Sequence, residues 1–320
     1  MSAETRHAKH DTGRLDLRDG WRRRAEELGY DVDELIRAAA PEPPGPDGGL
    51  RADGPQGPRT PSPEEIAQEV FDPRHGLTAF DKEFSTAQLL ARVADACRYG
   101  VRSEELEDLA LRVLGVQGYA KALPPRGSQL MEHTERYTTL DILRAERTIV
   151  DQARNRYADG SARLSADQAA AALSVFEVSA GFTLGGEQRR VVERLLTAGH
   201  GVDAVIGVAG SGKTSLMEAC RVGWDGVGLT YAGASLSAVA AQNLYEGSGI
   251  PSRTVAAWLQ RIHGGDGLTG IDVLVLDEAV MTDDRSLAVL LTEAARTGTK
   301  VIGIGDPQQL QAIGPGGGFA

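Results

Sequence analysis

Residues 207–214, with the sequence GVAGSGKT, constrain the fold of this chain more than any other stretch. They match the pattern G-x-x-x-x-G-K-[ST], follow the apolar run VDAVIGV and precede SLMEACRVG, which is typical of a helix. Glycines in such a loop let backbone N–H groups close around phosphate oxygens, and the N-terminus of the following helix favours negative charge. The pattern therefore predicts a strand, a phosphate-binding loop and a helix, in that order.

This loop implies a Mg²⁺-bound nucleoside triphosphate such as ATP as the ligand. We expect Lys213 to reach the β- and γ-phosphates and the hydroxyl of Thr214 to hold Mg²⁺. The residues predicted to surround the phosphates are Gly207, Gly210, Ser211, Gly212, Lys213 and Thr214.

Short apolar runs rich in β-branched residues follow one another after residue 180, with helix-like stretches between them. They are VDAVIGV (202–208), GVGLTYA (226–232), DVLVLDEA (272–279) and KVIGIGD (300–306). This alternation predicts parallel strands joined by crossover helices, which is an α/β fold with helices on both faces of the sheet.

Two of these runs end in residues suited to nucleotide chemistry. The run over 274–276 leads into Asp277 and Glu278, of which the first is expected to hold Mg²⁺ and the second to activate the attacking water. The last run leads into GDPQQL (305–310), which we interpret as a sensor of the γ-phosphate because it follows the next strand and faces the same sheet edge.

The rest of the chain divides by composition. Residues 41–63 hold eight of the 14 prolines, which predicts a semi-stiff linker between an N-terminal helical segment (1–40, with its helix over 15–40) and the remainder of the chain. Residues 64–180 are predicted to form a mostly helical accessory region, and 181–320 the α/β ATPase domain.

Several features predict where helices of the accessory region begin. Ser85 with Gln88, and Ser165 with Gln168, are capping-box patterns, and Ser103 is a third candidate cap for a helix that ends at Gly115. A further helix is expected over 138–158, with Leu140, Leu143, Ile149 and Val150 near one side.

Composition excludes several classes of protein. The net charge of −11 argues against a uniformly basic nucleic-acid binder, although it leaves local basic grooves open. No run of about 18 apolar residues predicts a membrane span, and the polar N-terminus does not resemble a secretory signal. Two cysteines cannot make a disulfide framework, so we expect a cytoplasmic protein with no membrane partner.

Six blocks in residues 181–320 together resemble superfamily 1 DNA helicases, in particular the RecD-like motor of conjugative relaxase–helicases of the TraA, TraI and TrwC group. The blocks are LGGEQRRVV, GVAGSGKT, GASLSAVAAQNL, SRTVAAWL, LVLDEA and GDPQQL. Upstream, ERYTTLDILRAERTI and WRRRAEELGYD resemble more loosely the region that joins relaxase to helicase in such proteins.

The resemblance implies a RecA-like motor domain of the 5′–3′ type that works in plasmid transfer. It implies that Gln188 contacts the adenine, that Gln309 senses the γ-phosphate, and that Ser235 and Thr254 contact the backbone of single-stranded DNA. Tyr231 and Trp258 are candidates for stacking on bases, although aromatic residues often serve the core. The other partners that it implies are a complementing helicase half and relaxosome proteins.

The sequence departs from this family in three places. Val280 stands where the family usually has Gly or Ser. The sequence stops at Ala320, ten residues past Leu310, so we expect only the first motor domain, without the arginine finger of a second one and with weak hydrolysis. His7 and His10 form an H-x-x-H pair without a third ligand or an early tyrosine, so nicking activity is not expected.

Two other interpretations stay open. The chain could be a non-catalytic module that binds nucleotide, single-stranded DNA or a partner, in which case turnover would stay at background despite ATP binding. A small-molecule kinase is disfavoured by the GDPQQL block and by the lack of a lid segment with clustered arginines.

Overall fold

The computed structural model describes residues 23, 31, 61–98, 100–124, 135–207, 212–306 and 314–317. The chain forms two units, Met1–Gly57 and Pro58–Ala320, and the helices and strands between residues 63 and 305 all belong to the second. The predicted helix over 15–40, all but the last residues of the predicted linker, and the His7–His10 pair lie outside the described residues. None of the described helices is both long and apolar enough to cross a membrane.

A five-stranded parallel sheet forms the centre of the α/β domain. Its strand order is β4-β8-β7-β5-β6, with every neighbouring pair parallel. The strands are β4 (Val202–Ile206), β5 (Tyr231–Ser235), β6 (Ser252–Thr254), β7 (Val273–Leu276) and β8 (Lys300–Gly305). β7 and β8 are buried along their whole length, as expected of strands covered on both faces.

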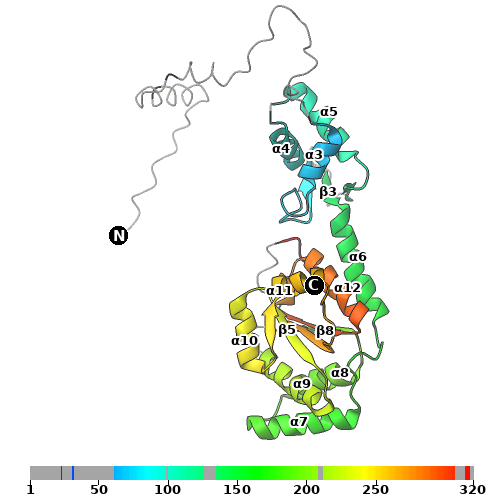
Figure 1. Cartoon of the computed structure of the whole chain (residues 1–320), viewed down its shortest axis with the longest axis vertical. Helices are drawn as coiled ribbons and strands as arrows, with labels where there is room; N and C mark the ends of the chain where they lie inside the picture. Colours follow the sequence, from blue (N-terminus) through cyan, green and yellow to red (C-terminus); the bar gives the residue numbers. More distant parts are fainter. Residues whose placement is uncertain are drawn as a thin grey trace, which may run out of the picture. The chain divides into compact units, whose positions relative to one another are not determined.

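Helices cover both faces of this sheet (Figure 1). Val273 and Val275 of β7 pack into one core with α7, α8, α9 and α10, whereas Leu274 and Leu276 pack into the other with α6, α11 and α12. These helices are α6 (Leu140–Asn155), α7 (Ala166–Ala180), α8 (Gly186–Thr197), α9 (Lys213–Val227), α10 (Ala238–Ser248), α11 (Val255–His263) and α12 (Asp284–Thr297), and a 3₁₀ turn, η1 (Ala279–Met281), follows β7. The predicted RecA-like α/β class is confirmed.

The region before α6 is mostly helical, as predicted, but it also contains a small antiparallel sheet that the sequence analysis missed. The sheet has the order β1-β3-β2 and packs against the helices around Phe71, Phe84 and Tyr137. Its strands are two to four residues long, too short to show an alternating pattern. The elements are α3 (Pro63–Val70), β1 (Phe84–Ser85), α4 (Thr86–Ala96), α5 (Ser103–Leu114), β2 (Ala120–Ala122) and β3 (Arg136–Thr139).

Two of the three predicted helix caps are confirmed. The hydroxyls of Ser85 and Ser165 accept hydrogen bonds from the N–H groups of Gln88 and Gln168, and both capping boxes are complete. The third is wrong, because Ser103 is the first residue of α5 and Arg102 stands at the cap without a side-chain hydrogen bond.

Two predicted elements have different limits in the structure. The helix expected over 138–158 begins at Leu140 because β3 occupies the residues before it, and it buries Ile142, Ala145 and Ile149 while Val150 stays 44% exposed. The strand expected over 226–232 is displaced to Tyr231–Ser235 because α9 continues to Val227.

The boundary between the core of the first region and the two cores of the α/β sheet falls between β3 and α6, and not at residue 180, where the accessory region was predicted to end. Ala145 and Ile149 of α6, and Leu173 and Phe176 of α7, belong to the two cores of the α/β sheet. Both helices were assigned by sequence to the accessory region, yet they pack as outer layers of the α/β domain. Whether the predicted regions 64–180 and 181–320 fold independently is not tested by this packing, so the domain limits stay predictions.

Candidate nucleotide-binding site

The order of the strands brings the predicted motifs to one edge of the sheet. β4, β8 and β7 are neighbours and run in the same direction, so the residues that come after them emerge side by side. Gly207 continues the pairing beyond β4, because its N–H donates to the carbonyl of Gly305 at 3.1 Å. Asp277 continues β7, with its N–H on the carbonyl of Ala234 at 2.9 Å. This edge is where open α/β sheets bind ligands.

The phosphate-binding loop leads into α9 through Gly212. This residue has φ 77°, in the left-handed region that glycine adopts without strain, and Lys213 is the first residue of the helix. The Lys213 ammonium donates to the carbonyl of Gly207 at 2.6 Å, so the lysine reaches back across the loop. The other loop residues that the sequence predicted, Gly210 and Ser211, lie outside the described residues.

A cavity of about 130 Å³ lies beside this lysine. Its polar wall holds Lys213, Thr214 and Asp277, three residues that the sequence predicted to act together, and also Asn243 of α10. The remaining lining residues are Met217, Leu244 and Ile304. Asn243 was missed by the sequence analysis, although it belongs to the block GASLSAVAAQNL on which the resemblance rests.

The two acidic residues after β7 have an unusual environment. Burial raises the pKa of the Asp277 carboxyl, against the opposing effects of the Glu278 N–H, which donates to it at 3.0 Å, and of the Lys213 charge. Burial and the neighbouring Asp277 raise the pKa of Glu278. Glu278 also has φ 53°, which is rare for a residue with a side chain and is found preferentially at functional sites.

These residues fit Mg²⁺ and a triphosphate. A hydroxyl and a carboxylate are the oxygen ligands that Mg²⁺ prefers, and Thr214 and Asp277 line the same cavity. Lys213 supplies positive charge there, and α9 begins at this residue, so the positive end of its helix dipole lies at the site. The half-buried carboxyl of Asp277, whose ionised form is disfavoured by partial burial, would gain a compensating charge from the metal.

Of the two predicted glutamines, one lies in the described part of the chain. Gln188 of α8 accepts the N–H of Gly185 at 2.9 Å, and its Nε2 lies 2.6 Å from the position that a Cβ on Gly212 would take. It is therefore in contact with the last glycine of the loop. Asp306 is buried at the end of β8, whereas Gln309 lies outside the described residues.

The two polar residues expected to contact single-stranded DNA lie side by side in the sheet. Ser235 and Thr254 are direct neighbours in the pairing of β5 with β6, at the same edge as the loop. The Ser235 hydroxyl is buried, and among the described residues it has no hydrogen-bond partner. The Thr254 hydroxyl caps α11 by accepting the N–H of Ala257.

Neither aromatic candidate for base stacking lies exposed at the edge of the sheet that carries the loop. Trp258 is 3% exposed and donates its indole N–H to the carbonyl of Gly233, so it belongs to the core. Tyr231 stands at the beginning of β5, at the opposite edge of the sheet, and its hydroxyl donates to Asp225.

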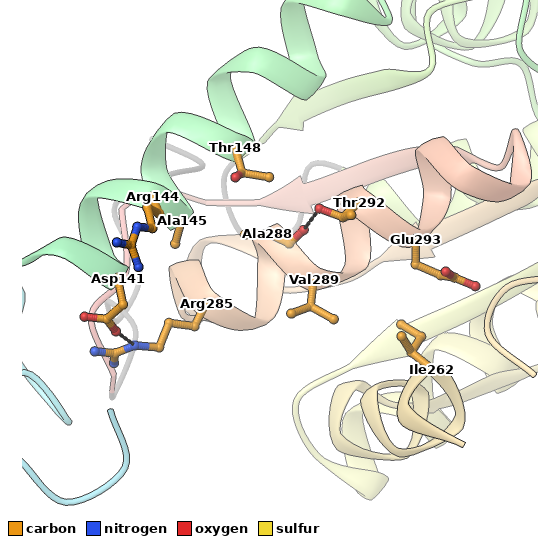
Figure 2. Close-up of a pocket in the computed structure, with 10 residues that line it drawn as sticks. All are labelled: Asp141, Arg144, Ala145, Thr148, Ile262, Arg285, Ala288, Val289, Thr292 and Glu293. Atoms are coloured by element: carbon orange, nitrogen blue, oxygen red, sulfur yellow. Dashed lines mark hydrogen bonds and ion pairs between the residues drawn. The ribbon is translucent and has the colours of Figure 1, made fainter. Parts of the chain in front are cut away.

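A second hollow, of about 370 Å³, lies between α6, α11 and α12 (Figure 2). Ala145, Val289 and Ile262 contribute apolar lining, and Arg285 and Asp141 lie together at one end. None of the residues that the sequence assigned to nucleotide or DNA lines it.

Comparisons with known proteins agree with the motifs. Residues 183–320 match the model of a family described as AAA domain. The "Probable conjugal transfer protein TraA" of Sinorhizobium fredii is 39% identical over 137 residues, which is 42% of this chain and 12% of that protein. The "Conjugal transfer protein TraA" of Rhizobium radiobacter is 35% identical over 188 residues, 58% of this chain and 16% of that protein.

The chain thus spans a small part of the length of the relatives that it matches. Among solved structures, the Pif1 helicase from Candida albicans matches with 22% identity and a TM-score of 0.33, over 41% of this chain and 34% of that one. Residues 183–320 thus match the AAA domain model, and the predicted resemblance of this chain to conjugal transfer proteins of the TraA group is confirmed.

Proposed function

We propose that the α/β domain binds Mg·ATP and serves as the first motor domain of a superfamily 1 DNA helicase that works in conjugal plasmid transfer. The observation that carries the proposal is the convergence of Lys213, Thr214 and Asp277 on one cavity at the edge where β4 and β8 end. The similarity to TraA proteins supports the conjugal setting.

The residues take distinct roles in this proposal. Lys213 exchanges the carbonyl of Gly207 for the β- and γ-phosphates, while Thr214 and Asp277 hold the metal. Bound there, Mg²⁺ would neutralise charge on the phosphoryl oxygens. Glu278 orients the attacking water and accepts its proton, for which a raised pKa is suited because it brings the carboxylate closer to the basicity that general-base catalysis needs.

Two further residues complete the nucleotide site. Gln188 lies against Gly212 and is proposed to contact the adenine, and Gln309 is proposed to sense the γ-phosphate. Ser235 and Thr254 are proposed to contact single-stranded DNA. We expect the affinity for this DNA to be low when the 320 residues are tested alone. A second motor domain supplied in trans and relaxosome proteins are the proposed protein partners.

We expect slow turnover from these 320 residues measured without a second motor domain. An arginine finger contributes about 10³- to 10⁵-fold to the rate of such reactions, and the resemblance implies that the second motor domain supplies it. Nucleotide binding is therefore a more direct test of the proposed function than hydrolysis.

The test is a titration of the purified chain with a fluorescent ATP analogue in the presence of Mg²⁺, next to Lys213→Ala and a matched control, Lys121→Ala. Lys121 lies exposed on β2, outside the α/β domain. We expect Lys213→Ala to weaken binding by roughly 10- to 100-fold, because hydrogen bonds to charged groups contribute about 1.5–3 kcal/mol, and Lys121→Ala to leave it unchanged.

Turnover measured with and without single-stranded DNA then distinguishes the two interpretations of the sequence. DNA-stimulated hydrolysis that Lys213→Ala abolishes supports a motor domain. Tight binding with background turnover under both conditions supports the non-catalytic module. A chain that binds no nucleotide would refute the proposal.

A further inference from the structure

The region before α6 meets the α/β domain through charged side chains at the first turn of α12. The ammonium of Lys82, from the loop before β1, lies 2.5 Å from the carboxylate of Asp284 and 2.6 Å from that of Glu146. Asp284 is fully buried, whereas Lys82 keeps 26% of its side chain exposed. A buried carboxylate is costly unless it is paired, so a lysine from another part of the chain helps to stabilise the first turn of α12.

The neighbouring residue of α12 makes a second link to the same loop. Arg285 binds Asp141 of α6 at 2.6 Å, as Figure 2 shows, and donates to both the carbonyl and the hydroxyl of Thr78, at 2.9 and 3.0 Å. Thr78 is fully buried and its hydroxyl is 2.9 Å from that of Thr139. The loop over 78–82 is thus held on α12 by two consecutive residues.

Residues 314–317 lie between this loop and α12. The N–H of Asp284 donates to the carbonyl of Pro315 at 2.9 Å. A Cβ on Gly314 would lie 3.1 Å from the Cβ of Asp283 and 3.9 Å from the carbonyl oxygen of Ala79. A Cβ on Gly317 would lie 3.5 Å from the Lys82 ammonium. One face of this segment therefore contacts the accessory region and the other contacts the motor domain.

This segment follows the nucleotide site closely in the chain. Asp306, at the end of β8, precedes Gly314 by eight residues, and the block GDPQQL lies at the beginning of that interval. The Asp284 N–H belongs to the first turn of α12, where N–H groups lack partners within the helix, so the carbonyl of Pro315 satisfies a donor that would otherwise be left buried. Asp284 therefore contacts Pro315 through its N–H and Lys82 through its carboxylate, so the position of residues 314–317 is linked to the ion pair with Lys82.

We infer that Lys82 acts as a positioning residue, which fixes residues 314–317 through Asp284 and so makes the accessory region a regulator of the nucleotide site. This inference rests on the proposed function, since it concerns the regulation of that site. Coupling between two sites is reciprocal, so nucleotide at the loop should in turn stabilise the contacts of Lys82.

The test is hydrogen–deuterium exchange on the full chain, comparing the wild type with Lys82→Met, Lys82→Arg and the exposed-lysine control Lys121→Met. We expect Lys82→Met to speed exchange of the Asp284 amide and of residues 314–317 by roughly tenfold or more, because it removes the positive charge that pairs with the buried Asp284 carboxylate. Lys82→Arg should retain most of the protection and Lys121→Met all of it. Unchanged exchange in Lys82→Met, with β7 still protected, would overturn the inference.

A second arm uses a non-hydrolysable ATP analogue with Mg²⁺ and remains informative even if Lys82→Met unfolds. In the wild type, the analogue should slow exchange of residues 78–86, and in folded Lys82→Met this effect should be lost. If the analogue binds, as fluorescence shows independently, and residues 78–86 do not respond, the coupling is refuted. If it does not bind at all, the proposed function fails instead, and the exchange difference between wild type and Lys82→Met decides whether Lys82 positions the segment.

Discussion

Gly247 of α10 offers a sharp test of how Thr214, the proposed Mg²⁺ ligand, is positioned. A Cβ on this glycine would lie 2.4 Å from the methyl carbon of Thr214, whereas ordinary contact begins at 3.4 Å, so Gly247→Ala must displace the threonine by about 1 Å. Threonine is β-branched and stiff at χ1. The methyl group therefore moves only if the hydroxyl moves with it, or if α10 shifts outward.

The expected consequences for stability and for binding differ. Alanine in place of glycine within a helix gains up to about 1 kcal/mol, and overpacking costs about 1–3 kcal/mol, so the unfolding free energy should fall by about 0–2 kcal/mol. A hydroxyl displaced by about 1 Å no longer suits the metal, and a misplacement of that size can cost on the order of 100-fold in a reaction that depends on alignment. We expect Mg·ATP affinity to fall by roughly 10- to 100-fold.

The assay is nucleotide titration with Mg²⁺ and with EDTA, together with thermal unfolding. The matched control is Gly226→Ala, since a Cβ on Gly226, also in a helix, meets nothing within 4 Å. The control should bind normally and unfold at an equal or higher temperature. The loss in Gly247→Ala should be confined to the Mg²⁺ condition. If Gly247→Ala binds Mg·ATP as the wild type does, then α10 does not hold Thr214 in place.

Three further outcomes are expected from the site. Burial raises the pKa of Asp277, so its ionised form opposes folding. Asp277→Asn should therefore raise the Tm of the nucleotide-free protein at pH 7, and this gain should grow as the pH rises above about 4 and vanish below it. The same substitution should weaken Mg·ATP binding. An equal Tm at pH 7 would contradict this. Glu278→Gly should stabilise the chain by about 1 kcal/mol in chemical denaturation because φ 53° suits glycine, whereas Glu278→Gln should not; equal midpoints would argue against strain. Trp258→Phe should cost about 1–3 kcal/mol of stability through the lost hydrogen bond to Gly233 and leave affinity for single-stranded DNA unchanged, and a drop in DNA affinity without a drop in stability would restore the stacking role.

Sequence patterns predicted the parts of this fold that local chemistry decides. The capping boxes at Ser85 and Ser165 were predictable because both partners lie within one turn, and the strand over 273–276 because its residues are all apolar. The limits of β5 were not predictable, because the helix before it extends to Val227 through packing of Trp224 in the core rather than through propensity.

The site shows the same division between local and long-range information. Lys213, Thr214 and Asp277 were predicted from motifs, and the structure brings all three to one cavity. Asn243 and the contact of Gly247 with Thr214 arise only when α10 folds against α9, and no local pattern indicates which face of α10 turns toward the loop. The burial of Trp258 was not predictable, because it depends on neighbours that are distant in sequence.

The pairing of β4 with β8 has a consequence for synthesis on the ribosome. Among the described strands, β4 is hydrogen-bonded only to β8, whose residues are made about 100 positions later, so the loop at Gly207 cannot take its final form until Gly305 has left the exit tunnel. At about 5–20 residues per second, roughly 5–20 s pass during which β4 has no partner strand. The nascent α/β domain therefore exposes an unpaired apolar strand for that time, which makes it a natural client for chaperones that shield such segments.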